Sequence, residues 1–148
     1  MFRYIGCHDN VRRACKLANN LKSNNNFYQL LRNYQRFDMA NVTNEMVAAL
    51  LKNHAKLDVE VKTYKPWWPW SKAIAMFKPS KPHTVYLNAR RLNRSDASIV
   101  GSLIHEYVHL VDNLYKEYSF GHGSNSKKGK EHTAPYAAGR LSNQFYEQ

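Results

Sequence analysis

Cysteine, acidic residues and long apolar runs are all scarce in this sequence. It has two cysteines, only 11 Asp and Glu against 22 Lys and Arg, and no apolar run close to the roughly 20 residues that a membrane-spanning helix needs. The first nine residues lack the apolar stretch of a secretory signal. These absences exclude a disulfide-rich scaffold and a membrane-spanning helix. We therefore expect a cytoplasmic protein, unless it is exported by a non-classical route.

The two cysteines do not form a metal-binding Cys-x-x-Cys pair, because Cys7 and Cys15 are eight positions apart. If one helix carries both, the helix rise separates them by about 12 Å. That distance is too long for a disulfide, so we expect two reduced thiols.

The shortage of acids leaves a net charge of +11, and the charge is unevenly spread. Residues 61–95 carry eight Lys and Arg and no acid, while residues 1–36 carry seven basic residues and one Asp. Such a field attracts nucleic acid, anionic membranes or acidic proteins, without distinguishing among them. A hydrophobic content of 43% over 148 residues is enough for one domain with a real core.

Hydrophobic periodicity predicts helices, then a small sheet, then a long helix. The predicted elements are helices at 11–21, 27–34 and 43–53, strands at 57–64, 73–77 and 84–88, a long helix from Asp96 to about Tyr115, and a short helix near 136–145. Thr43 and Ser95 are suitable N-caps for two of these helices. This order predicts a single α+β domain over residues 1–148.

The long helix contains the segment His105-Glu106-Tyr107-Val108-His109. Positions four apart on a helix differ by about 400°, so His105 and His109 project from one face, one turn apart, and can bind one metal ion. Glu106 is rotated about 100° from His105, where it can take a proton from a metal-activated water. The alternative is that these are two core histidines with a coincidental glutamate. Apolar residues surround the segment and favour the metal site, since buried His and Glu are costly unless paired or ligated.

A catalytic zinc normally has three protein ligands and one open position. The best third candidate is His122, thirteen residues after His109, because the glycines on either side let the backbone turn back sharply. His132 and Glu131 are alternatives. Asp112 is another, although it is better suited to orient a ligand histidine.

Tyr136 is a candidate for stabilising the transition state. A phenol near the metal can donate a hydrogen bond to the oxyanion of a tetrahedral intermediate. The alternative is that this tyrosine, one of ten in the chain, simply packs against the long helix.

The segment from His105 to His109 resembles the signature of the zincin metallopeptidases. The resemblance implies zinc bound by His105 and His109, and Glu106 as the general base. It also implies a small twisted, mainly antiparallel sheet over the active-site helix, with an edge strand that binds extended peptide. We therefore expect a protein or peptide substrate.

The subfamily is less clear from the sequence. Tyr115 stands where metzincins have their third histidine, and Glu131 lacks the Asn-Glu context of thermolysin-like enzymes. Residues 121–123 are similar to the third-ligand segment of SprT-like proteases, but the cysteine-rich ribbon of many such proteins is missing. Residues 133–139 resemble the Pro-Tyr-x-x-Gly ending of small zincin-like proteins of bacteria and phages.

All three tryptophans lie within Trp67-Trp68-Pro69-Trp70, between lysines and prolines. Proline on both sides favours an extended loop. The simpler interpretation is a loop folded over the sheet with its indoles buried. The alternative is an exposed rim that stacks on bases, sugars or substrate aromatics.

The sequence thus predicts a zinc metallopeptidase, with a basic nucleic-acid-binding module that has a structural zinc as the alternative. In that alternative His132 would be the fourth ligand of a closed site. A third hypothesis combines the two, as a peptidase toxin or effector or as a peptidase drawn to nucleic acid by its charge.

Overall fold

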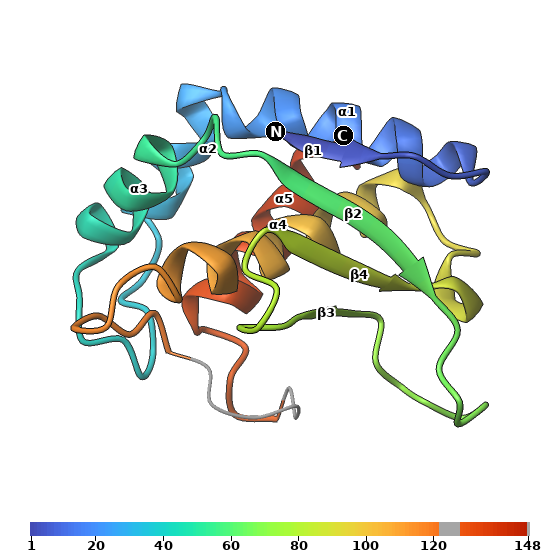
Figure 1. The fold of residues 1–148 in the computed structure, drawn as a ribbon. Coiled ribbons are helices and arrows are strands. Elements are labelled where there is room, and N and C mark those ends of the chain that lie inside the picture. The colour runs from blue at the N-terminus through green and yellow to red at the C-terminus, as the bar shows by residue number, and fades with distance from the viewer. Residues whose placement is uncertain (122–127, 148) are drawn as a thin grey trace.

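The computed structural model describes residues 1–121 and 128–147 (Figure 1). The elements in this part of the chain are β1 (Phe2–Tyr4), α1 (Asp9–Lys22), α2 (Asn25–Arg32), α3 (Asn44–Asn53), β2 (Val59–Tyr64), β3 (Ala75–Phe77), β4 (Thr84–Asn88), the 3₁₀ turn η1 (Ala89–Arg91), α4 (Asp96–Asp112) and α5 (Ala134–Tyr146). The predicted order of helices, sheet and long helix is confirmed, and so is the mixture of helix and sheet. Strand β1 was not predicted, because three residues are too few to show an alternating pattern.

The sheet is mixed, so the expectation of a mainly antiparallel sheet is wrong. Its strand order is β1-β2-β4-β3, with β2 parallel to both β1 and β4, and only β3 antiparallel to β4. The physical reason is the connection between β1 and β2. Three helices lie between these strands and return the chain to the same end of the sheet, so the two strands run in the same direction.

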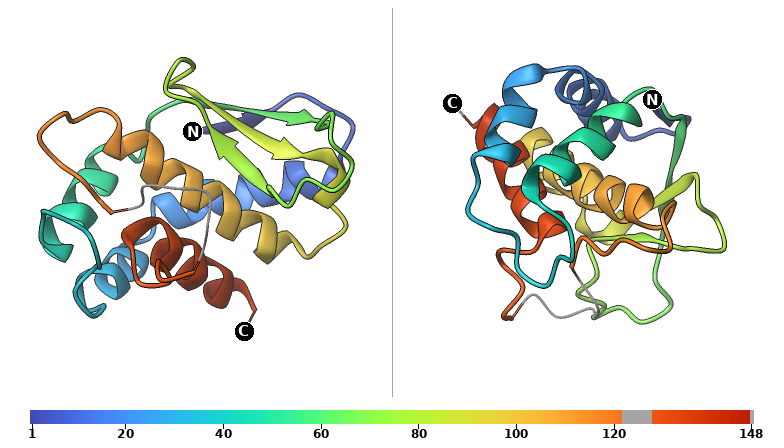
Figure 2. Two further views of the ribbon diagram at one scale, coloured as in Figure 1. Left: turned by 90° about the horizontal axis from the view of Figure 1, so that it is seen from below. Right: turned by 90° about the vertical axis from the view of Figure 1, so that its left-hand side faces the viewer.

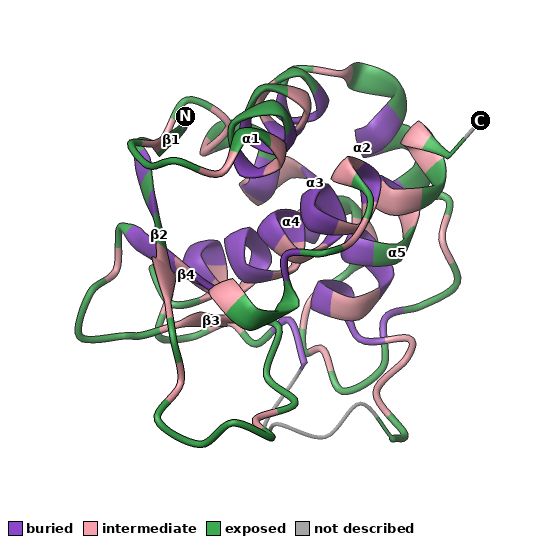
Figure 3. Ribbon diagram, turned by 90° about the vertical axis from the view of Figure 1, so that its right-hand side faces the viewer, coloured by how far each residue is buried: buried purple, intermediate pink, exposed green. Residues whose placement is uncertain are grey.

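Helices cover one face of the sheet (Figures 1 and 2). Along β2, Val59 and Val61 are buried and Glu60 and Lys62 are exposed, so alternate side chains face the helices and the solvent (Figure 3). Helix α4 lies under the sheet and packs against α1, α3, α5, β3 and β4. The buried side chains of α4 therefore lie at the centre of the core.

Helix α4 begins where the sequence predicts and ends slightly earlier. The side chain of Ser95 accepts a hydrogen bond from the backbone of Ser98 at 3.1 Å, as expected for an N-cap. The helix ends at Asp112 rather than near Tyr115. Its buried residues include Val100, Leu103, Ile104, Val108 and Val111. Apolar contacts on several sides hold this helix in place.

The tryptophan segment is not folded over the sheet, and the interpretation with buried indoles is wrong. Trp67, Trp68 and Trp70 are 90%, 54% and 70% exposed, in the connection between β2 and β3. Prolines at positions 66 and 69 restrict this connection, and α4 already fills the space under the sheet.

Both cysteines are free thiols in the structure. Cys7 is exposed and precedes α1, while Cys15 is buried within that helix, and burial raises the pKa of the Cys15 thiol to about 12. In the described part of the chain, no helix has the length and apolar character needed to cross a membrane.

Lys22, at the end of α1, is almost completely buried. Its ammonium lies 4.8 Å from the ring centre of Phe2 and 4.2 Å from that of Tyr107, and donates to the backbone oxygen of Leu57 at 3.4 Å. Burial lowers the pKa of Lys22 to about 8, opposed in part by the negative charge of Asp58. The folded protein therefore releases this proton more readily than the unfolded chain.

Because the pKa of Lys22 is lower in the folded protein than in the unfolded chain, the contribution of Lys22 to stability should depend on pH. Lys22→Met should remove that dependence. From about pH 8 to pH 10.5 the unfolded chain keeps the Lys22 proton and the folded protein loses it, so this side chain makes the wild type more stable as the pH rises. At pH 7 the free energy of unfolding of Lys22→Met should exceed that of the wild type by about 2 to 3 kcal/mol. Urea unfolding of both proteins across this pH range measures the difference. The exposed Lys52→Met is the control, and an equal difference at pH 7 and pH 10.5 would contradict the expectation.

Candidate metal centre

His105 and His109 meet on one face of α4, as their spacing predicts. Both are half-buried, and their Nε2 atoms are 3.2 Å apart, with ring centres separated by 4.9 Å. Two nitrogens bound to a tetrahedral zinc at 2.0–2.1 Å are about 3.3 Å from each other. The two Nε2 atoms therefore already have the separation that two ligands of one zinc ion need.

Glu106 lies beside the histidines on the side of α4 that faces the sheet. Its side chain is only 7% exposed, and the backbone N–H of Phe77, the last residue of β3, donates a hydrogen bond to it. Burial raises the pKa of Glu106 to about 7, and the hydrogen bond from Phe77 partly opposes this rise. Glu106 is thus a carboxyl group fixed between the helix and the edge strand.

Tyr136 lies on the opposite side of His105, at the start of α5. The two ring centres are 4.6 Å apart and the rings are nearly perpendicular, with an angle of 70°. Burial raises the pKa of Tyr136, and the negative charges of Glu106 and Glu131 raise it further. The neutral phenol is therefore kept as a hydrogen-bond donor close to the histidine pair.

Two glycines bring α5 to this position, and one of them, Gly139, ends the Pro-Tyr-x-x-Gly segment. A Cβ atom placed on Gly139 would lie 2.8 Å from the backbone oxygen of Gly101 and 3.3 Å from Cβ of His105. A Cβ on Gly101 would lie equally close to the backbone oxygen of Gly139. The two helices therefore cross with their backbones in contact, which places Tyr136 over His105. The Pro-Tyr-x-x-Gly pattern includes Gly139, but one glycine in each of two distant helices does not signal in a single sequence that the helices cross.

The described residues do not show a third ligand beside His105 and His109. His122 lies outside the described residues, and residues 1–121 and 128–147 contain no group of three His, Cys, Asp or Glu side chains that could hold a metal ion. Two of the alternatives are engaged elsewhere. Nδ1 of His132 is 2.8 Å from the hydroxyl of Tyr34, and the Asp112 carboxylate accepts from the backbone N–H of Phe120 at 3.1 Å.

Glu131, the remaining alternative, stands just before α5 and is near enough to raise the pKa of Tyr136 by its charge. The hydrogen bond that Asp112 accepts joins the end of α4 to the chain at Phe120, and its predicted role in orienting a ligand histidine stays a prediction. Burial raises the pKa of Asp112 to about 6, and that hydrogen bond partly opposes the rise.

Tyr64, the last residue of β2, also belongs to this region and was missed. Its hydroxyl is buried and has no hydrogen-bond partner within the described ranges. Burial raises the pKa of Tyr64, and so does the negative charge of Glu106. Tyr64 is one of ten tyrosines in the chain and stands at the end of a strand, so nothing in the sequence marked it as a site residue. The structure therefore adds a buried phenol near Glu106.

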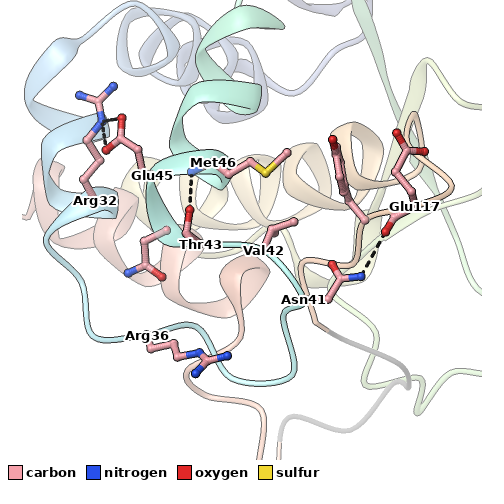
Figure 4. Close-up of a pocket in the computed structure, with 10 residues that line it drawn as sticks. Arg32, Arg36, Asn41, Val42, Thr43, Glu45, Met46 and Glu117 are labelled. Atoms are coloured by element: carbon pink, nitrogen blue, oxygen red, sulfur yellow. Dashed lines mark hydrogen bonds and ion pairs between the residues drawn. The ribbon is translucent and has the colours of Figure 1, made fainter.

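The pocket next to α3 is separate from this region. It is lined by Arg32, Arg36, Asn41, Val42, Thr43, Asn44, Glu45, Met46, Glu117 and Tyr118 (Figure 4). Several of its polar groups already bind one another, including the Arg32–Glu45 ion pair at 3.0 Å and the N-cap of α3 at Thr43. None of the candidate site residues lines it.

Comparison of the chain with protein-family models, with curated proteins and with solved structures finds no match. What the site can do is therefore argued from its own chemistry. Two convergent imidazoles, a fixed carboxyl group and a neutral phenol form a set suited to binding a metal and moving a proton.

The helix crossing predicts that Gly139→Ala destabilises the fold. Alanine in an ordinary helix is better than glycine by about 1 kcal/mol, but the backbone contact with Gly101 should reverse the sign and cost about 1 to 3 kcal/mol. Urea unfolding measures the change, and Lys52→Ala on the exposed side of α3 should stay within about 0.5 kcal/mol of wild type. A more stable Gly139→Ala protein would contradict the close crossing.

Proposed function

We propose that this chain is a zinc-dependent peptidase, and specifically an endopeptidase acting on protein or peptide substrates. The observation that carries the proposal is the pair of Nε2 atoms 3.2 Å apart with the buried carboxyl group of Glu106 beside them. This separation is close to that of two nitrogen ligands on one tetrahedral zinc ion. The resemblance of this segment to the zincin signature supports the same assignment, with His122 as the third ligand.

Zinc, when bound, would polarise the scissile carbonyl and lower the pKa of a water molecule to about 7. Glu106 takes a proton from this water as it attacks the carbonyl carbon. It then gives a proton to the amine nitrogen as the carbon–nitrogen bond breaks, so that one carboxyl group serves both steps. The backbone N–H of Phe77 lies next to this carboxyl group and favours its charged form.

Tyr136 fits the role of a donor to the developing oxyanion. Its ring packs against His105, and a tyrosine phenol is protonated at neutral pH. A preorganised neutral donor stabilises charge that appears only in the transition state.

The edge of the sheet offers a binding surface for an extended substrate. Strand β3 is the outermost strand on this side of the sheet, and its last residue contacts Glu106. A peptide that pairs with β3 would pass over the catalytic carboxyl group, as in other cases of strand addition. Substrate recognition by main-chain hydrogen bonds suits a peptidase of broad specificity.

Glu106→Gln tests the mechanism directly. Because glutamine keeps the size of the side chain but cannot take a proton, the variant should retain zinc and lose cleavage by about 10² to 10⁴-fold. Zinc content is measured by atomic emission after gel filtration, and cleavage with a fluorescently labelled unfolded protein. The exposed Glu117→Gln is the matched control and should cleave normally. Undiminished cleavage by Glu106→Gln, or wild-type cleavage that a chelator does not stop, would overturn the proposal.

The third ligand is tested by comparing two histidine variants. His122→Ala should lower zinc affinity at least about tenfold, since a ligand is lost. His132→Ala should keep zinc, because His132 is hydrogen-bonded to Tyr34. Titration with a zinc-sensitive dye measures both affinities. Loss of zinc from His132→Ala alone, with that protein still folded, would reassign the ligand and favour a closed structural site.

A further inference from the structure

The connection between β2 and β3 concentrates exposed apolar side chains. Of the nine large apolar side chains exposed in the described part of the chain, four lie within residues 65–74, which we call the tryptophan loop. They are Trp67, Trp68, Trp70 and Ile74, and Ile74 is 45% exposed. Apolar side chains gathered in this way mark a surface that binds something.

The tryptophan loop is held in shape by the protein. The backbone N–H of Ser71 donates to the oxygen of Trp68 at 3.2 Å and closes a turn at the tip. The returning strand is bound to Asn88, whose side chain and backbone donate to the oxygens of Ala73 and Ile74 at 2.8 and 2.9 Å. Pro66 and Pro69 further restrict the backbone. The indoles are therefore presented with little conformational entropy left to lose on binding.

The indoles pack against one another and leave no gap between them into which a base could stack. Trp67 and Trp68 have ring centres 5.9 Å apart at an angle of 35°, and Trp68 and Trp70 have theirs 5.0 Å apart at 64°. Neither of these pairs is parallel with the room between its rings that an intercalated base needs. The cluster forms a compact apolar tip instead.

Positive charge surrounds this tip. Lys65 and Lys72 are exposed at the two sides of the loop, and the exposed Arg91 donates to the backbone oxygen of Ser71 at 3.3 Å. Residues 61–95 contain no acidic residue. An anionic surface that approaches the loop therefore meets only attractive charges from this part of the chain.

We propose that the tryptophan loop binds anionic lipid membranes, inserting its indoles and Ile74 at the interface while Lys65, Lys72 and Arg91 contact the headgroups. Tryptophan prefers the membrane–water interface, where its ring is apolar and its N–H meets water. Ile74 favours lipid over single-stranded nucleic acid, because an aliphatic side chain gains from acyl chains and has no ring on which a base can stack. The proposal is independent of the metal centre.

Intrinsic fluorescence tests insertion specifically, because all three tryptophans of the chain lie in this loop. Titrating the wild-type protein with vesicles of phosphatidylcholine and phosphatidylserine should shift the emission to shorter wavelength. Bromine-labelled lipids in the same vesicles should quench it. Vesicles of phosphatidylcholine alone should bind at least about tenfold more weakly, because their surface lacks the negative potential that attracts lysine and arginine.

Vesicle sedimentation with matched variants separates the contribution of the tryptophans from that of the lysines. Replacing the three tryptophans with alanine should weaken binding at least about tenfold, whereas the control Leu30→Ala/Met39→Ala/Leu114→Ala removes three exposed apolar side chains elsewhere and should bind normally. Lys65→Gln/Lys72→Gln should weaken binding about thirtyfold, at about 1 kcal/mol for each lysine. The control Lys52→Gln/Lys56→Gln removes equal charge away from the loop and should change binding by less than about twofold. Circular dichroism verifies that every variant is folded.

Two results would overturn the proposal. One is vesicle binding that produces no fluorescence shift, or vesicle binding that the variant without tryptophans retains. The other is an absence of vesicle binding together with tight binding of single-stranded DNA that depends on the tryptophans, which would assign the loop to nucleic acid. Glu106→Gln should bind vesicles like wild type, so the result stands apart from the outcome for the metal centre.

Discussion

Helices α4 and α5 are in backbone contact at Gly101 and Gly139, and the geometry of the candidate site depends on this contact. Side chains at either position would separate the helices. With them close, Tyr136 packs on His105 from one side, while the edge strand β3 reaches Glu106 from the other. The polar residues of α4 are thus enclosed by a helix and a strand that are distant from each other in the sequence.

Burial shifts the pKa values of ionisable groups in this protein and also lowers its stability, because the charged forms lose their hydration. Glu106 and Lys22 lie where ionisation is unfavourable. The pKa of Glu106 is raised and that of Lys22 is lowered, and both shifts favour the neutral form. Lys22 contacts the aromatic rings of Phe2 and Tyr107 and a backbone oxygen. Glu106 accepts a hydrogen bond and lies beside two imidazoles, where a bound cation would stabilise its charge. The same physical effect is structural at one position and suited to proton transfer at the other.

The proposed metal centre and the tryptophan loop both belong to the half of the sheet formed by β4 and β3. Strand β3 begins directly after the loop and ends at the Glu106 contact. If both proposals hold, a membrane surface bound by the loop would lie close to the entrance of the peptide-binding edge. Substrates at or near such a surface would then be favoured by proximity.

The sequence by itself determined the helices and strands with clear periodicity, the caps at Thr43 and Ser95, and the convergence of His105 and His109, because each depends on residues close along the chain. Only the tertiary structure decided the parallel strand pairs, the exposure of the indoles, the partner of His132 and the crossing at Gly101 and Gly139. These depend on contacts between segments far apart in the sequence. Such contacts are set by how whole helices and strands pack, which no local pattern records.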